Sequence, residues 1–97
     1  MIFFRQVKGN SMKPTLRNGQ IVFAHEVRKF KPGQVVIAFV QGKEVIKRIT
    51  RIKNGSVYLQ GDNLNESTDS REYGPIPDSK IEGVVFFPRI FKEVESK

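Results

Sequence analysis

The stretch VVIAFV, residues Val35–Val40, is a continuous apolar run of mostly β-branched residues. Its length fits a strand that is buried on both faces. The following Gln41-Gly42-Lys43 predicts a tight turn into a second strand over residues 44–53. Asn54-Gly55 is the strongest hairpin signal in the chain, so residues 56–60 are expected to return as the partner strand. The centre of the chain is therefore predicted to consist of successive strands joined by tight turns.

The flanking segments extend the same pattern. Strands are expected over residues 2–7, 20–24 and 81–87, with Pro88 ending the last one. Residues 61–77 are polar and weakly periodic, which predicts a long ordered loop of functional interest. The tail over residues 93–97 is charged and expected to fray. The prediction is a mainly β fold, with residues 1–97 forming a single compact domain of folded ribbons or a barrel-like sheet.

Composition limits the classes of protein that the chain can belong to. Its 97 residues include 17 Lys and Arg, 10 Asp and Glu and no Cys, for a net charge of +7. The charge favours anionic partners, and the missing cysteines exclude disulfides and thiolate chemistry. No segment approaches the roughly 20 apolar residues of a membrane span. Arg5 follows the first apolar residues too soon for a signal-peptide core.

Lys47 has an unusual position for a charged side chain. Alternation along residues 44–53 places Val45, Lys47 and Ile49 on one face, with residues 46, 48, 50 and 52 on the other. An edge-strand lysine or a snorkelling side chain would explain this pattern. The sharper hypothesis is that burial lowers the pKa of Lys47 towards neutrality, because desolvation disfavours the charged form. A neutral amine can then accept a proton from a serine hydroxyl.

The segment GNSMKPTL, residues 9–16, offers such a serine. Gly9 and Asn10 tolerate unusual backbone angles, and Pro14 restricts both itself and the residue before it. A serine on a rigid turn between two strands can present its hydroxyl outward as a nucleophile. The alternative interpretation is an ordinary polar turn.

Three segments carry a resemblance to a known family. Residues 11–16, SMKPTL, resemble the nucleophile box of type I signal peptidases, and residues 45–49, VIKRI, resemble their general-base box. Residues 61–63, 67–71 and 73–75 resemble their third conserved box. The sequence of this box is also similar to that of mitochondrial inner-membrane proteases. The three boxes occur in the family's order within one small β domain. The resemblance implies a signal-peptidase-like or repressor-protease-like fold and a Ser-Lys serine endopeptidase.

The resemblance also implies roles for individual residues. Ser11 would be the nucleophile and Lys47 the general base, with Ser67 orienting the Lys47 amine. Asp69 and Arg71 would form a structural ion pair under the site.

The turn that carries the nucleophile would also form the oxyanion hole. The resemblance implies that the backbone N–H of Ser11 is one donor, a kind of contribution worth about 3 kcal/mol. Gly9 and Asn10 would complete this turn. Some family members have a serine two residues before the nucleophile as a second donor, and Gly9 lacks that hydroxyl.

The implied substrate is an extended precursor peptide, such as a signal or leader peptide, added to a strand edge. Met12, beside Ser11 on the turn, is the candidate substrate contact, whereas strand aromatics such as Phe4, Phe23 and Phe87 are expected to pack mostly inward. No cofactor or metal is implied. Family members usually carry a membrane anchor, which this sequence lacks. The expectation is a soluble cytoplasmic or membrane-peripheral protein, and a truncated anchor and membrane-surface association stay open.

Other functions are weighed against this one. His25, the only histidine, lies beside Glu26, where a local pairing is expected rather than a triad. A basic nucleic-acid-binding barrel is an alternative, but basic residues on alternating faces do not form one stripe. A catalytically impaired peptidase-like domain is another. Self-cleavage of the repressor type is not expected, because Ala24 and Ala38 both fall in predicted strands.

Overall fold

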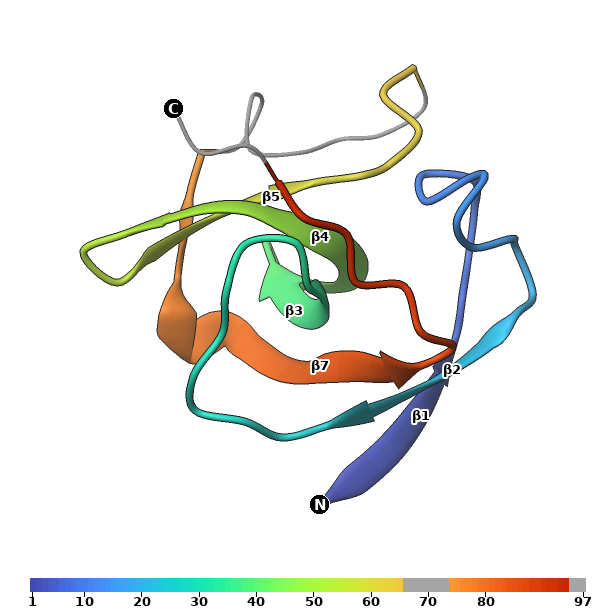
Figure 1. Ribbon diagram of the computed structural model, residues 1–97, viewed down its shortest axis with the longest axis horizontal. Coiled ribbons are helices and arrows are strands. Elements are labelled where there is room, and N and C mark those ends of the chain that lie inside the picture. The colour runs from blue at the N-terminus through green and yellow to red at the C-terminus, as the bar shows by residue number, and fades with distance from the viewer. Residues whose placement is uncertain (66–73, 95–97) are drawn as a thin grey trace.

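The computed structural model describes residues 1–65 and 74–94, which form one antiparallel sheet of seven strands (Figure 1). The strands are β1 (Ile2–Gln6), β2 (Ile21–His25), β3 (Val35–Val40), β4 (Lys43–Lys53), β5 (Ser56–Gln60), β6 (Ile76–Pro77) and β7 (Ile81–Phe87). One 3-10 turn, η1 (Asp78–Lys80), leads into β7. Within the described ranges, no helix is long and apolar enough to cross a membrane.

The strand order is β1-β2-β7-β3-β4-β5-β6, so the last strand of the chain lies between β2 and β3. Figure 1 shows β7 passing across the middle of the molecule, with the β1–β2 and β4–β5 ribbons on either side of it. The mainly β prediction is confirmed, and all six predicted strands are present. The sequence did not predict β6, at the end of the expected loop, or η1, directly after it. A strand of two residues is too short to show a period.

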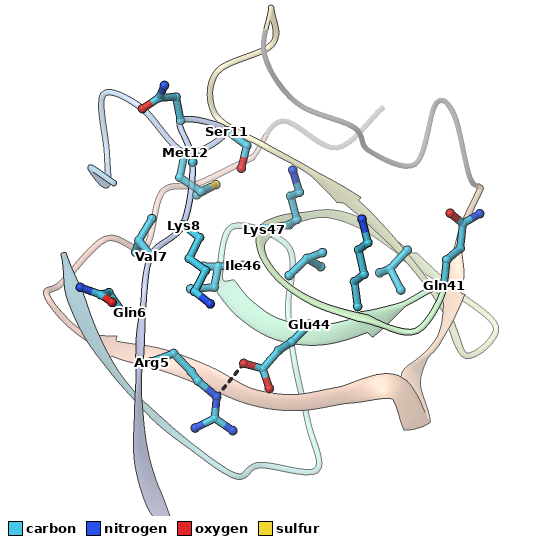
Figure 2. A pocket seen from close by; sticks show the side chains of 15 residues that line it. Arg5, Gln6, Val7, Lys8, Ser11, Met12, Gln41, Glu44, Ile46 and Lys47 are labelled. Atoms are coloured by element: carbon cyan, nitrogen blue, oxygen red, sulfur yellow. Dashed lines mark hydrogen bonds and ion pairs between the residues drawn. The ribbon is translucent and has the colours of Figure 1, made fainter. Parts of the chain in front are cut away.

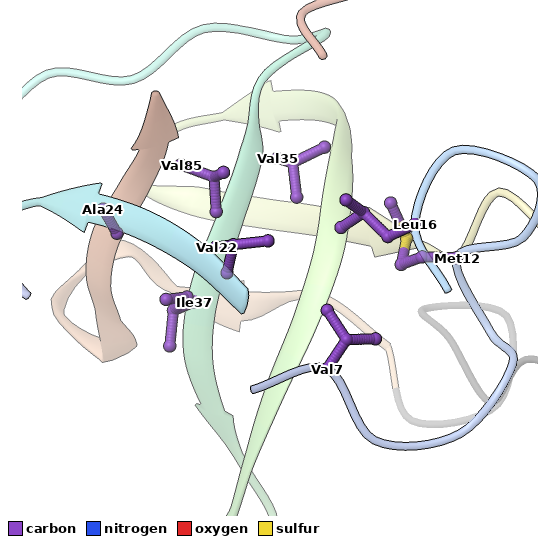
Figure 3. Packing of buried hydrophobic residues seen from close by; sticks show 8 residues of the cluster. All are labelled: Val7, Met12, Leu16, Val22, Ala24, Val35, Ile37 and Val85. Carbon is purple, nitrogen blue, oxygen red and sulfur yellow. The ribbon is translucent and has the colours of Figure 1, made fainter. Parts of the chain in front are cut away.

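The strand β3 separates two hydrophobic clusters, and its residues alternate between them. Val35 and Ile37 pack with Val22, Leu16 and neighbours, as Figure 3 shows. Val36, Ala38 and Val40 pack on the other side with residues of β4, β5 and β7. The prediction that this run is buried on both faces is therefore confirmed for every position except Phe39, which is exposed.

The alternation of β4 changes at one point. Ile49 pairs with Leu59, but the next pair is Arg51 with Tyr58, so Thr50 is an extra residue. The prediction that Ile52 lies on the face opposite Ile49 is wrong, because this bulge shifts the alternation by one residue. Both isoleucines pack in the same cluster.

The expectation that the strand aromatics pack mostly inward is also wrong. Phe4, Phe23 and Phe87 are 59%, 39% and 60% exposed. Strand pairing explains this, because Val22 and Ala24 take the inward positions of β2 and leave Phe23 on the outer face. The register places Phe4 and Phe87 on either side of Phe23, with ring centroids 6.0 and 6.4 Å from it.

Candidate active site

A cleft of about 980 Å³ opens beside the turn that carries Ser11 (Figure 2). Its walls are the end of β1 with the following turn on one side and the β3–β4 hairpin with the first half of β4 on the other. The lining residues are Arg5, Gln6, Val7, Lys8, Gly9, Asn10, Ser11, Met12, Val40, Gln41, Lys43, Glu44, Val45, Ile46 and Lys47.

The sheet topology explains why the cleft exists. In the described part of the chain β1 pairs only with β2, and so it ends the sheet. The strand β4 pairs with β3 over Lys43–Arg48 but with β5 only from Arg48 onward. The first half of β4 therefore has one strand neighbour, and its other edge carries no ladder partner among the described residues. Two strand edges border the cleft.

Ser11 and Lys47 line this same cleft from different walls. Ser11 lies partly exposed on the turn after β1, whereas the Lys47 residue is only 5% exposed. Lys47 pairs with the fully buried Val36 of β3. Figure 2 shows the Lys47 side chain extending towards that of Ser11.

Hydrogen bonds from the backbone and the side chain of Asn63 hold the serine turn against the segment after β5. The Asn63 N–H donates to the carbonyl of Ser11 at 2.8 Å, and the Asn63 side chain donates to the carbonyl of Asn10 at 3.0 Å. On the other side, the Gly9 N–H donates to the Asn18 side chain at 2.8 Å. Gly9 has a φ of +84°, a conformation that glycine adopts without steric cost.

A buried ion pair connects this segment to the strand of Lys47. Arg48 donates to both carboxylate oxygens of Asp62 at 2.8 and 2.7 Å, and to the carbonyls of Gly33 and Ile90 at 2.7 and 2.8 Å. The Thr15 hydroxyl, on the serine turn, donates to the same carboxylate. Burial alone would raise the pKa of Asp62, but the hydrogen bonds from Arg48 and Thr15 hold the pKa below its usual value.

Sequence reasoning missed this ion pair. Arg48 lies next to Lys47 in the sequence and is equally withdrawn from solvent, at 5% exposure. The available signal was a second cation among the apolar residues of β4, which needs a carboxylate partner when it is buried. The carboxylate partner of Arg48 is Asp62.

The other predicted site residues are placed as follows. Met12 lines the cleft but is only 1% exposed, because its side chain packs in the first hydrophobic cluster. Ser67, Asp69 and Arg71 lie outside the described residues, so their predicted roles stay predictions.

A second charged group lies at the end of the cleft away from Ser11. Arg5 of β1 donates to Glu44 of β4 at 2.6 Å, across the gap between the two strands (Figure 2). Glu82 of β7 lies beside Glu44. Burial raises the pKa of Glu82 to about 7, and the neighbouring Glu44 carboxyl adds to the rise.

The structure also bears on the alternative functions. His25 stacks edge-on against Phe86 at 5.2 Å and does not line the cleft. Ala24 and Ala38 are fully buried in strands, so neither lies in an accessible linker. Lys47 and Arg48, two of the basic residues that a nucleic-acid-binding face could use, are buried.

Comparison with known proteins supports the family resemblance inferred from the sequence. The Peptidase S24-like family model matches residues 1–86. The mitochondrial inner membrane protease subunits 1 of Mus musculus and Homo sapiens are each 35% identical over 106 residues, covering 81% of this chain and 64% of theirs. The LexA repressor of Pasteurella multocida is 29% identical over 83 residues, covering 84% of this chain and 39% of the repressor.

The chain thus spans a little under two-thirds of the length of the inner membrane proteases that it matches. The family match extends over most of the chain, from the first strand into β7. It includes all residues of the cleft walls. The resemblance inferred from the three sequence boxes is confirmed at the level of the family: this chain belongs to the Peptidase S24-like family.

Proposed function

We propose that the protein is a serine endopeptidase in which Ser11 is the nucleophile and Lys47 the general base. The observation that carries the proposal is that a serine on a rigid turn and a lysine that is 5% exposed line one cleft. Withdrawal from water disfavours the ammonium form of a lysine, and a general base must be neutral.

The chemistry follows from these two groups. Lys47 Nζ accepts the proton of the Ser11 hydroxyl as Oγ attacks the scissile carbonyl, and an oxyanion forms that the Ser11 N–H stabilises. The ammonium then donates its proton to the leaving amine, which leaves an acyl-enzyme. Neutral Lys47 next takes a proton from a water molecule as the water oxygen attacks the acyl carbonyl. It returns that proton to Ser11 Oγ as the ester bond breaks and the new carboxyl terminus is released.

The substrate in this proposal is an extended segment of a precursor protein, such as a signal or leader peptide. The cleft is bordered by β1, which ends the sheet, and by the half of β4 that has only β3 as its neighbour. An extended chain can hydrogen-bond to such edges as an added strand. Val7, Val45 and Ile46 supply apolar wall between them.

Precursor peptides incubated with the wild-type protein and with Ser11→Ala and Lys47→Ala variants test the dyad. Wild type should cleave, and each variant should lose cleavage while keeping its thermal midpoint within a few degrees. Ser56→Ala is the matched control, because Ser56 lies in β5 outside the cleft. Cleavage that survives either dyad substitution contradicts the assignment, and a wild type that cleaves nothing points to an impaired peptidase-like domain.

We further propose that the protein works at a membrane surface. The support is the outer aromatic row of Phe4, Phe23 and Phe87 on three neighbouring strands, together with a net charge of +7 and the inner membrane proteases among the relatives. Exposed apolar patches commonly mark membrane or protein contact, and basic proteins favour anionic lipid.

Sedimentation with anionic lipid vesicles tests this localisation. Phe4→Ser and Phe87→Ser together should weaken vesicle binding, whereas Phe39→Ser, an exposed phenylalanine of β3 outside the row, should not. Equal binding by all three proteins contradicts the proposed surface.

A further inference from the structure

The charged side chains that line the cleft are unevenly balanced. Four are basic, and Glu44 is the one acid among the described residues there; the basic ones are Arg5, Lys8, Lys43 and Lys47. Glu44 is already bound by Arg5 at 2.6 Å. Neither Lys8 nor Lys43 forms an ion pair with any of the described residues. Two lysines that form no ion pair with the described residues therefore face an open cleft, and Lys8 is close enough to Glu44 for their charges to interact.

These two lysines belong to opposite walls. Lys8 follows β1 and lies three residues before Ser11, whereas Lys43 is the first residue of β4 and lies four residues before Lys47. Both residues are exposed, so their ammonium groups are free to meet a ligand. Figure 2 shows the Lys8 side chain reaching between the two walls, past Ile46 and towards Glu44.

The spacing sets where a peptide would meet them. A strand rises about 3.3 Å per residue, so Lys43 lies roughly 13 Å along β4 from Lys47. A peptide extended along this edge advances at the same rate. The side chain that passes Lys43 is therefore about four residues away from the bond at Ser11.

We propose that the cleft selects precursor peptides with an Asp or Glu about three to five residues from the cleaved bond, on the half that lies along β4. This inference rests on the proposed peptidase function. The carboxylate would form a charge-assisted hydrogen bond with Lys43 on the β4 wall or with Lys8 on the opposite wall, according to the face of the peptide on which it lies. The Arg5–Glu44 pair spans the two walls of the cleft, and Arg5 offsets the charge of the one acid among the described lining residues.

Electrostatics in a concave site favour this selection. Like charges lining a cleft add their potentials and raise the local concentration of the opposite charge. A Lys or Arg in the same peptide position would meet two ammonium groups, and the one acid among the described lining residues, Glu44, is already bound by Arg5. Both lysines are exposed, so salt should weaken the preference.

The test uses matched peptides that carry Asp, Asn or Lys at each position within six residues of the cleaved bond. In low salt, Asp should raise kcat/KM over Asn by about three- to tenfold at the selected position, as expected for one or two exposed ion pairs. Lys should lower it. The Lys8→Gln, Lys43→Gln double variant and high salt should each bring the Asp-to-Asn ratio close to one. Lys53→Gln, at the far end of β4 and outside the cleft, should keep the wild-type ratio.

Equal kcat/KM for Asp and Asn at every position, or a preference that the double variant retains, overturns the inference even though cleavage occurs. If no peptide is cleaved, the peptidase proposal fails separately, and fluorescence anisotropy of the same peptides with the Ser11→Ala protein decides the charge preference. Tighter binding of the Asp peptide, lost in the double variant, supports the inference. Equal binding of both peptides, or tighter binding of a single-stranded oligonucleotide than of any peptide, overturns it.

Discussion

Arg48 binds Asp62 through two hydrogen bonds of 2.8 and 2.7 Å, with side chains only 5% and 13% exposed. Arg48 follows Lys47 in β4, and Asp62 precedes Asn63, which donates to the carbonyls of Asn10 and Ser11. Thr15 binds the same carboxylate from the serine turn. The pair therefore joins the strand of the candidate base to the turn of the candidate nucleophile.

Removing the Asp62 carboxylate should be strongly destabilising. Asp62→Ala leaves the Arg48 guanidinium buried with only carbonyl partners, and breaking a buried pair in this way costs about 3–5 kcal/mol. Urea unfolding of the variant should show a loss of this size. Glu44→Ala, which breaks the more exposed Arg5–Glu44 pair, is the comparison and should cost at most about 1 kcal/mol. Similar losses in the two variants would contradict the structural role given to Asp62.

The contribution of the Asp62 carboxylate to stability should decrease at acidic pH. The pKa of Asp62 is lower in the folded protein than its ordinary value of 3.8, so this group stabilises the fold above that value. The contribution is lost as pH falls through the folded pKa. In Asp62→Asn this part of the acid-induced loss should be absent, as measured by unfolding free energies at a series of acidic pH values. An unchanged pH slope in Asp62→Asn would show that other carboxylates account for it.

Glu82 should change the free energy of unfolding with pH in the opposite direction to Asp62. Its pKa rises from 4.5 to about 7 on folding, so the folded state holds more protons than the unfolded state between these values. The stability from protonated Glu82 is fully present below pH 4.5 and is lost as pH rises to about 7. The groups facing it are Glu44 on β4 and Arg5 on β1. Glu82→Gln should flatten the fall in unfolding free energy over this window, and an unchanged slope would contradict the shift.

Substitution of Asn63 should lower the rate of peptide cleavage. Asn63→Ala removes the hydrogen bond to the Asn10 carbonyl, a contact worth about 1 kcal/mol, and loosens the turn that presents Ser11. We expect kcat of peptide cleavage to fall several-fold with a smaller change in KM. Asn65→Ala is the control, since Asn65 is exposed two residues further on. A decrease in kcat that is equal in both variants would argue against a positioning role for Asn63.

Gly9 should be required for its backbone conformation. At φ +84° a side chain is strained although a Cβ would meet no atom within 4 Å, so Gly9→Ala should lose about 1 kcal/mol of stability. Gly9→Asn should lose less, because asparagine tolerates left-handed backbone better. Thermal unfolding of the two variants measures the difference. Equal stability of wild type and Gly9→Ala would contradict the reason given for glycine at this position.

The sequence by itself determined the strands and indicated the residues of the candidate site. Strand positions follow from period-two alternation and from turns such as Asn54-Gly55, which depend on steric preferences of neighbouring residues. The continuous apolar run of β3 specified a strand buried on both faces, because it has no polar position that would face solvent. Lys47 could be singled out because it lies between Val45 and Ile49 on one strand face. Ser11 could be singled out because residues 11–16 resemble the nucleophile box of type I signal peptidases.

Only the tertiary structure decided which distant residues meet. Arg48 and Asp62 are 14 residues apart, Arg5 and Glu44 are 39, and Thr15 and Asp62 are 47. These contacts depend on strand order and on registers such as the Thr50 bulge, which the packing of the whole sheet selects and no local pattern encodes. Strand pairing likewise turned Phe4, Phe23 and Phe87 outward, because aliphatic residues filled the inward positions of β2. Local sterics therefore specified the strands, and long-range pairing built the cleft.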